Sequence, residues 1–127
     1  HLKTKLTSLL NDKHINTMVI MTNTEEFVIF HELTIAPQNG RKMIGKGEAA
    51  ALALAKVNCG IIASNNLKDI SQYALQYNLL HVTTGKILIE ALNNNLIDEN
   101  MGNRIWSTML QKKRILPAPT FSDYLRQ

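Results

Sequence analysis

The chain has 127 residues, of which 45% are hydrophobic and 19% charged, and its formal net charge is +4. This composition excludes an intrinsically disordered protein, and the length suits one compact domain over residues 1–127. Because no apolar run approaches a membrane span, no secretory signal pattern opens the chain and Cys59 has no partner for an intrachain disulfide, we expect a cytoplasmic protein that does not enter a membrane.

The first third of the chain predicts helices followed by one strand. Apolar residues recur at helical spacing over 2–21 and predict two helices that are separated at Asn11–Asp12, with Asp12 as the N-cap of the second. The apolar and aromatic run 27–30 favours a strand. Residues 36–42 include proline and glycine and predict a loop.

The rest of the chain alternates helices with short strands. The predicted elements are a helix over 46–57, a strand over 61–63 buried on both faces, a helix to about 77, a strand over 79–82, a helix to 92 and a last helix from Asp98 toward 112. Gly60 is expected to end the first of these helices in the left-handed conformation, and Cys59 is expected to be buried. The alternation predicts the α/β class, with helices covering a short parallel sheet.

Polar side chains gather at two helix starts on either side of the 61–63 strand. Glu48 lies in the first turn of one helix, and Asn65, Asn66 and Asp69 open the next. Ligands of open α/β sheets bind outside the carboxyl ends of the strands, so these side chains form a candidate cation site. Each residue also has a structural role, because acidic residues complement helix N-termini and asparagine is a good N-cap.

Other sites find less support in the sequence. The histidines are scattered without zinc-site spacing, and the Gly45–Gly47 segment lacks the pattern of a phosphate-binding loop. Two basic groups offer a track for nucleic-acid phosphates, although most charge runs are simply solvated surface. These groups are Arg41, Lys42 and Lys46, and Lys112, Lys113 and Arg114.

The order of these features resembles the PIN domain, a nuclease family. The resemblance covers about residues 44–124 and is carried by GKGEAAALALA, ASNNLKDISQYA and HVTTGKILIEALNNNLID. It implies a three-layer α/β/α fold with a short, mostly parallel sheet. It also implies a site in which clustered acidic residues bind Mg²⁺ or Mn²⁺, so that activated water cleaves RNA. Many members are toxins of toxin–antitoxin pairs, which implies an antitoxin partner, and dimerisation through helices is plausible.

The resemblance assigns roles to individual residues and also shows departures. Glu48 matches the acidic residue that opens the middle helix, and it is expected to help hold the cation. Asn65 and Asn66 stand where the family carries aspartates, so metal affinity should be weak, and Asp69 could compensate as a catalytic carboxylate. Lys86 falls near a position at which some members carry a further acid.

The first aspartate of the family belongs to an N-terminal central strand that nothing before Leu2 supplies. We therefore expect roughly thirty further residues upstream, which is the size of a short β/α unit. Three readings follow from the sequence: a metal-dependent ribonuclease with a weakened site, an inactive PIN-like module that binds nucleic acid or protein, and a small α/β protein with no site at that edge.

Overall fold

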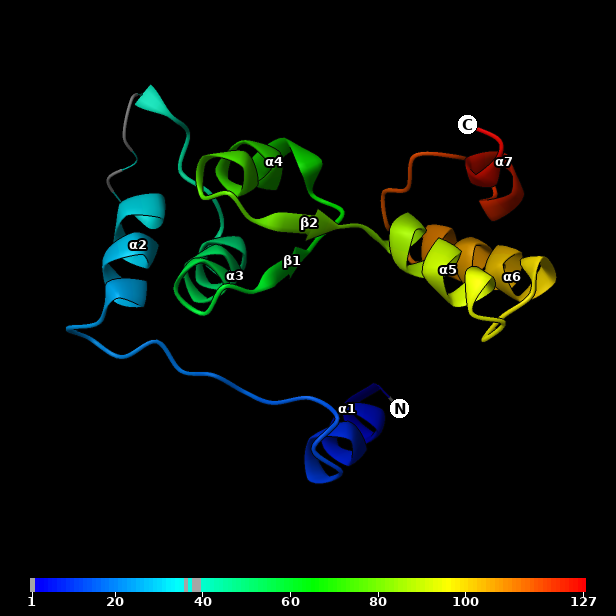
Figure 1. Ribbon diagram of the computed structural model, residues 1–127, viewed down its shortest axis with the longest axis horizontal. Coiled ribbons are helices and arrows are strands. Elements are labelled where there is room, and N and C mark those ends of the chain that lie inside the picture. The colour runs from blue at the N-terminus through cyan, green and yellow to red at the C-terminus, as the bar shows by residue number, and fades with distance from the viewer. Residues whose placement is uncertain (1, 36, 38–39) are drawn as a thin grey trace.

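The sequence folds into a mostly helical chain that contains one small parallel sheet (Figure 1). The computed structural model describes residues 2–35, 37 and 40–127. In chain order, its elements are α1 (Leu2–Asn11), α2 (Glu25–Thr34), α3 (Lys46–Val57), β1 (Ile61–Ala63), α4 (Leu67–Gln76), β2 (Leu80–Val82), α5 (Thr84–Asn93), α6 (Glu99–Gln111) and α7 (Phe121–Leu125). The predicted mixture of helices with a parallel sheet is confirmed at this level.

The sheet has one buried face rather than the two predicted. Its strands are paired in parallel, with Ile61 beside Leu80, Ile62 beside His81 and Ala63 beside Val82. Successive side chains of a strand point to opposite faces, so Ile62 is buried while Ile61 is exposed. Ile61 and Leu80, which share a face, are 60% and 70% exposed. The described helices therefore cover the Ile62 face and leave this apolar pair open.

A first hydrophobic cluster, here called the sheet core, forms where α3 and α4 pack on the covered face of the sheet and α2 packs on α3. Figure 1 shows α3 beside β1, and α2 lies on the side of α3 that faces away from the sheet. Alanine and leucine favour the helical state of α3 and let α2 approach it closely. The buried members are Leu33, Ile44, Ala49, Leu52, Ile62, Ile70, Tyr73 and Ala74.

A second cluster, the C-terminal core, joins α5, α6 and α7 and contains no strand residue. Its buried members are Leu88, Trp106, Ala118 and Phe121. The Trp106 indole N–H donates to the Ala118 carbonyl at 2.8 Å, and the Trp106 and Phe121 rings lie 5.8 Å apart. The indole is thus both packed and hydrogen-bonded, as a buried tryptophan requires. The short helix α7 was not predicted from the sequence.

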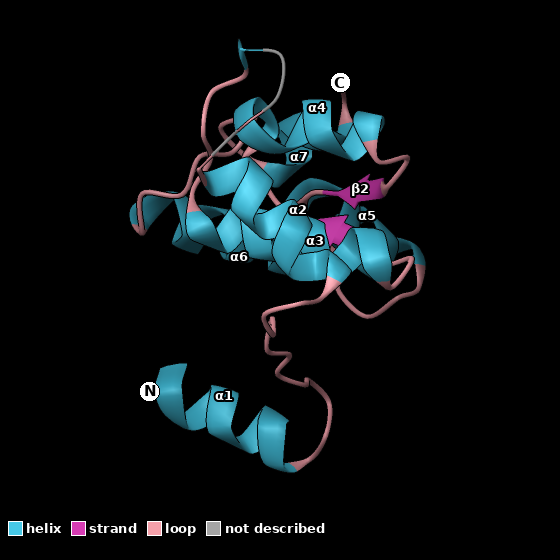
Figure 2. Cartoon of the chain, turned by 90° about the vertical axis from the view of Figure 1, so that its left-hand side faces the viewer, coloured by secondary structure: helices cyan, strands magenta, loops and turns pink. Residues whose placement is uncertain are grey.

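The N-terminal helix stands apart from both cores. Both views show α1 separated from the other elements by an extended segment (Figures 1 and 2), and α1 has no buried residue. The second helix predicted before residue 21 is wrong, because residues 16–21 have no regular secondary structure. Asp12 does not cap a helix; its backbone N–H instead donates to the Ser8 carbonyl at the end of α1.

The strand predicted for 27–30 is also wrong, because these residues lie inside α2. Thr24 caps this helix by accepting from the Phe27 N–H, and two glutamates follow in its first turn. Burial then follows the helical period rather than the period of two in a strand, since Leu33 is 1% exposed and Val28 is 63% exposed. The capping signal therefore prevails over a short run of strand-favouring residues.

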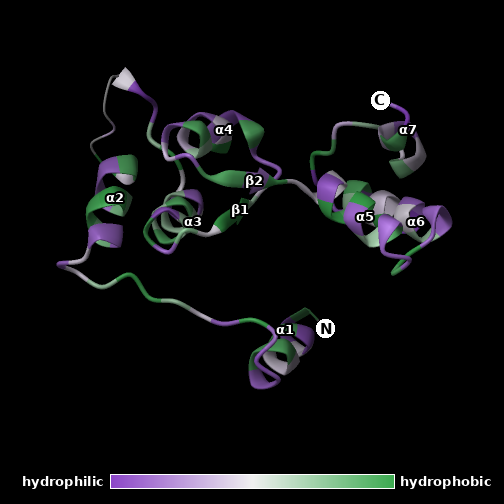
Figure 3. Ribbon diagram, viewed as in Figure 1, coloured by the Kyte–Doolittle hydropathy of each residue, from purple (hydrophilic) through white to green (hydrophobic). Residues whose placement is uncertain are grey.

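The predicted helix boundaries after residue 45 are largely confirmed, and most of their caps are as expected. Asn66, Thr83 and Asp98 each accept a backbone N–H as the N-caps of α4, α5 and α6. The α3–β1 turn differs from the prediction, because Cys59 takes the left-handed conformation with φ of 53° and is exposed. Figure 3 shows the resulting pattern, with hydrophobic strands and helices of mixed hydropathy.

Candidate metal-binding site

The carboxyl end of β1 is shaped by two consecutive polar turns. The Ser64 N–H donates to the Val82 carbonyl and extends the ladder of the sheet by one residue. The Ser64 hydroxyl then accepts from the Asn66 N–H at 3.0 Å, which turns the chain into α4. The Asn66 side-chain oxygen accepts from the Asp69 N–H at 3.4 Å and caps the helix.

Three of the predicted site residues meet at this point, and together they form the carboxylate cluster: Glu48, Asn66 and Asp69. The Asn66 amide nitrogen donates to Asp69 Oδ2 at 3.0 Å and to Glu48 Oε1 at 3.4 Å. The two carboxylates come from the first turns of α3 and α4, whose partial positive charge favours anions. All three side chains are half-buried. One amide group therefore links two carboxylates from different helices.

The cluster borders a small cavity. Glu48, Ser64 and Ile62 contribute to its lining, and its volume is about 230 Å³. Gly45 also shapes the region, because a side chain at that position would lie against the Glu48 carboxylate. This role of Gly45 was not predicted from the sequence, although the glycine lies only three residues before the candidate carboxylate Glu48.

Asn65 does not join the cluster. Its amide nitrogen donates to the Thr84 hydroxyl at 2.8 Å, and its amide oxygen accepts from the Thr84 N–H at 2.9 Å. Both polar ends of Asn65 are therefore used to tie the end of β1 to the start of α5. The contact explains why two successive asparagines occur here, since each caps or anchors a different helix.

The donor set near the cluster is small. Across the described ranges 2–35, 37 and 40–127, no group of three or more His, Cys, Asp and Glu side chains is close enough to hold a metal ion. The cluster offers two carboxylates, which are hard oxygen donors of the type that Mg²⁺ and Mn²⁺ accept, whereas the Asn66 amide directs its nitrogen toward them. A cation held by these two carboxylates would need further ligands from water or substrate.

The predicted basic residues lie in three different places. Arg41 is half-buried over the Tyr73 ring, 5.2 Å from its centroid, and donates to the Gln76 side chain at the far end of α4. Lys46 is exposed in the first turn of α3, near Glu48 in the chain, and Lys42 is exposed in the preceding loop. The remaining three, Lys112, Lys113 and Arg114, are exposed at the end of α6. Arg41 therefore packs on a tyrosine at the opposite end of α4 from Asp69.

Comparison of this chain with known protein families, with curated proteins and with solved structures finds no match. The residues and their geometry therefore carry the functional argument. In the part of the chain that the structure describes, no helix has both the length and the apolar character needed to cross a membrane.

Proposed function

We propose that this chain is a PIN-like, metal-dependent ribonuclease in which Glu48 and Asp69 bind Mg²⁺ or Mn²⁺. One observation carries the proposal: two carboxylates from different helices are linked by one amide group at the carboxyl end of β1. Glu48 and Asp69 open separate helices, and the Asn66 amide bridges them in addition to any favourable effect that each acid has on its own helix. The location is also the one at which open α/β sheets bind their ligands.

The proposed reaction requires the carboxylate cluster to hold only one cation. A bound Mg²⁺ would polarise a phosphodiester and lower the pKa of a water molecule. Two carboxylates suffice for such a site, because proteins commonly hold Mg²⁺ through one or two carboxylates together with substrate phosphates. Asn66 acts as a positioning residue, since its amide fixes both carboxylates in one geometry. Lys46, two residues before Glu48 in the first turn of α3, adds a positive charge to this end of the helix for the RNA backbone.

The proposal includes the three-layer arrangement of the PIN fold. The uncovered pair Ile61 and Leu80 supports it, because an exposed apolar sheet face is normally covered by a further layer of helices. In the three-layer α/β/α arrangement that the PIN resemblance implies, a neighbouring strand would also bring a further carboxylate to the cluster.

A second candidate function is a PIN-like module that binds RNA without cleaving it. The specific observation in its favour is the direction of the Asn66 amide, whose nitrogen, not its oxygen, faces both carboxylates. A hydrogen-bond donor between two acids satisfies part of the role that a cation would otherwise have. Turning the amide over would sacrifice the cap to Asp69.

The test compares Mn²⁺ binding, measured by electron paramagnetic resonance, in four variants. Glu48→Gln and Asp69→Asn should each abolish saturable binding, whereas Glu25→Gln, an exposed acid on α2, should leave it unchanged. Asn66→Asp replaces the donor by a third carboxylate, keeps the shape and remains a good N-cap. We expect it to tighten binding by about tenfold or more, because each added charge near the cation is strongly favourable.

Cleavage of a labelled RNA in Mn²⁺ decides between the two functions. Cleavage by the unaltered protein that Glu48→Gln abolishes supports the ribonuclease. RNA binding that persists in a chelator, without cleavage by the unaltered protein or by Asn66→Asp, supports the binding module. Equal Mn²⁺ affinity in Asn66→Asp and the unaltered protein would overturn the assignment of the cluster as a metal site.

A further inference from the structure

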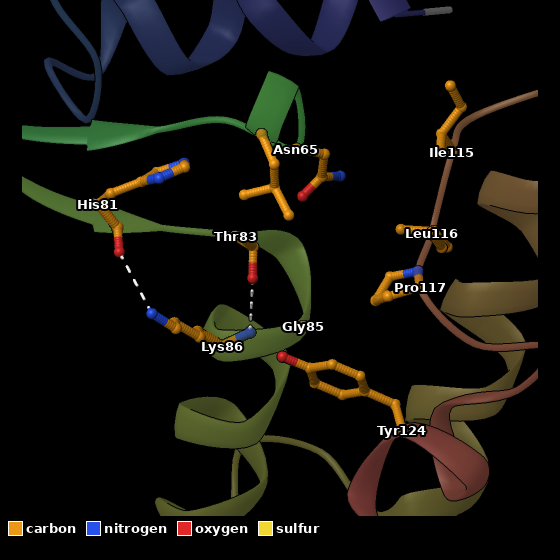
Figure 4. Close-up of a pocket in the computed structure, with 10 residues that line it drawn as sticks. Asn65, His81, Thr83, Gly85, Lys86, Ile115, Leu116, Pro117 and Tyr124 are labelled. Atoms are coloured by element: carbon orange, nitrogen blue, oxygen red, sulfur yellow. Dashed lines mark hydrogen bonds between the residues drawn. The ribbon is translucent and has the colours of Figure 1, made fainter. Parts of the chain in front are cut away.

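A second cavity, larger than the one beside Glu48, lies between the strand ends and the C-terminal core. Asn65 contributes to its lining. Its volume is about 410 Å³, which falls within the range of small-molecule sites. Figure 4 shows the start of α5 on one side and the α6–α7 connection with Tyr124 on the other. No residue that the proposed metal chemistry uses lines this cavity, so it requires a separate explanation.

One wall of the cavity is cationic and polar. Lys86 lies in the first turn of α5, where its backbone N–H donates to the Thr83 hydroxyl at 3.4 Å. Its ammonium group donates a long hydrogen bond of 3.5 Å to the His81 carbonyl, at the strand side of the cavity (Figure 4). None of the described residues that line the cavity is acidic. The ammonium and the α5 N-terminus therefore both favour an anion here.

The facing wall is apolar and aromatic. Ile115 and Pro117, in the segment before α7, contribute aliphatic surface, and Ile115 is 87% exposed at the rim. Tyr124 also lines this wall, and its ring packs against Trp106 at a centroid distance of 5.2 Å. Glycine at position 85 leaves room for the Tyr124 ring, because a side chain there would overlap the ring. A rigid aromatic ring beside a proline is a suitable surface for a flat, apolar group.

We infer that this cavity binds one unpaired nucleotide of single-stranded RNA, with its base against Tyr124 and Pro117 and its phosphate at Lys86. The two walls match the two ends of a nucleotide, which has a flat base and an anionic phosphate. Only an unpaired base can leave its stack to lie on an aromatic side chain. This inference rests on the proposed ribonuclease, because Asn65 in the cavity wall directly precedes Asn66 in the carboxylate cluster. A nucleotide held here places the adjoining RNA backbone beside that cluster.

The test measures RNA binding in a chelator, so that neither metal nor cleavage contributes. The probe is a fluorescently labelled single strand of six adenylates, followed by anisotropy. Lys86→Gln and Tyr124→Leu should each weaken binding by about tenfold, because aromatic stacking and phosphate contacts contribute on this scale. Lys68→Gln, an exposed lysine on α4 outside the cavity, should weaken it less than twofold. Tyr124→Phe keeps the ring and should retain affinity, which distinguishes stacking from loss of fold.

Competition identifies which part of the probe is recognised. Free adenosine monophosphate should displace the labelled strand, whereas adenosine and inorganic phosphate alone should each do so only at much higher concentration. A duplex of the same length should bind more weakly than the single strand. Equal binding of duplex and single strand, or equal affinity in Lys86→Gln and Lys68→Gln, would overturn the inference.

The two proposals can fail separately. Cleavage in Mn²⁺ with no effect of Lys86→Gln or Tyr124→Leu on binding overturns the nucleotide cavity and leaves the ribonuclease standing. Single-strand binding that depends on both residues, in a protein that cleaves nothing, supports the cavity and overturns the ribonuclease in favour of the binding module.

Discussion

The sheet core and the C-terminal core are built from different residues and are completed to different degrees. The sheet core uses alanine, leucine and isoleucine and leaves the pair Ile61 and Leu80 open on one face of the sheet. The C-terminal core closes around Trp106, which is fully buried, hydrogen-bonded and in contact with two further rings. The candidate site residues lie where the two cores meet. The helices of the sheet core supply the carboxylates of Glu48 and Asp69, and the C-terminal core supplies the cavity wall that contains Tyr124.

The largest expected effect comes from removing the centre of the closed core. Trp106→Ala should destabilise the protein by about 3–5 kcal/mol, because it opens a large cavity and leaves the Ala118 carbonyl without its donor. Urea unfolding followed by circular dichroism measures the loss. Hydrogen exchange should show that protection falls first in α5, α6 and α7. An equal loss of protection in α3 and α4 would show that the two cores are one cooperative unit.

A glycine pair tests how tightly each region is packed. Gly102 faces the Phe121 ring so closely that an added methyl group would overlap it, whereas nothing lies within 4 Å of the position a methyl group would take at Gly47. Gly102→Ala should therefore cost up to about 3 kcal/mol through overpacking, despite the better helix propensity of alanine. Gly47→Ala, the matched control in α3, should leave stability unchanged or raise it by up to about 1 kcal/mol. Thermal unfolding of both variants measures the difference, and similar melting temperatures would contradict it.

The accuracy of the sequence predictions changes along the chain near residue 45, within the sheet core. From residue 45 onward, local signals and tertiary packing agree, so an alanine-rich helix and polar caps such as Asn66 and Thr83 were predicted correctly. Before residue 45 they conflict. The run 27–30 has strand-favouring residues, but Thr24 and the glutamates after it start a helix that packs on α3. Residues 16–21 carry a helical spacing, but Met18, Val19 and Met21 are exposed, and spacing alone does not fold a helix.

The candidate site was predictable in position but only partly in membership. The rule that polar residues gather at strand ends predicted that Glu48, Asn66 and Asp69 would meet, and they do. It could not separate Asn65 from Asn66, because adjacent residues point in different directions once the chain turns. The wall formed by Tyr124 and Lys86 was not predicted, since it depends on how α7 returns to the start of α5, a contact between distant segments.

A smaller effect is expected at the link between the cores. Asn65→Ala removes both hydrogen bonds to Thr84 and should cost about 1–2 kcal/mol, because each such bond contributes on the order of 1 kcal/mol net. The more informative result is a change in cooperativity, because the link ties β1 to α5. A lower urea m-value or two separate transitions should follow. Asn58→Ala, which loses an exposed bond to Leu54 within one helix, is the control. Identical m-values in both variants would show that Asn65 does not couple the cores.

The smallest expected effect is a loss of stability at alkaline pH that originates in the sheet core. Partial burial, followed by the nearby Glu32 and Tyr73, raises the pKa of the Tyr77 hydroxyl above its usual 10.0, while Arg41 opposes the shift. The folded state thus retains its proton to higher pH than the unfolded state, and the associated stability is complete below pH 10 and is lost as pH rises through the folded pKa. Tyr77→Phe should flatten this alkaline decline, and Glu32→Gln should make it smaller, because it brings the folded pKa of Tyr77 back toward 10.0. Urea unfolding across the alkaline range, with phenolate absorbance to follow ionisation, measures both, and an unchanged decline in Tyr77→Phe would place its origin in another residue.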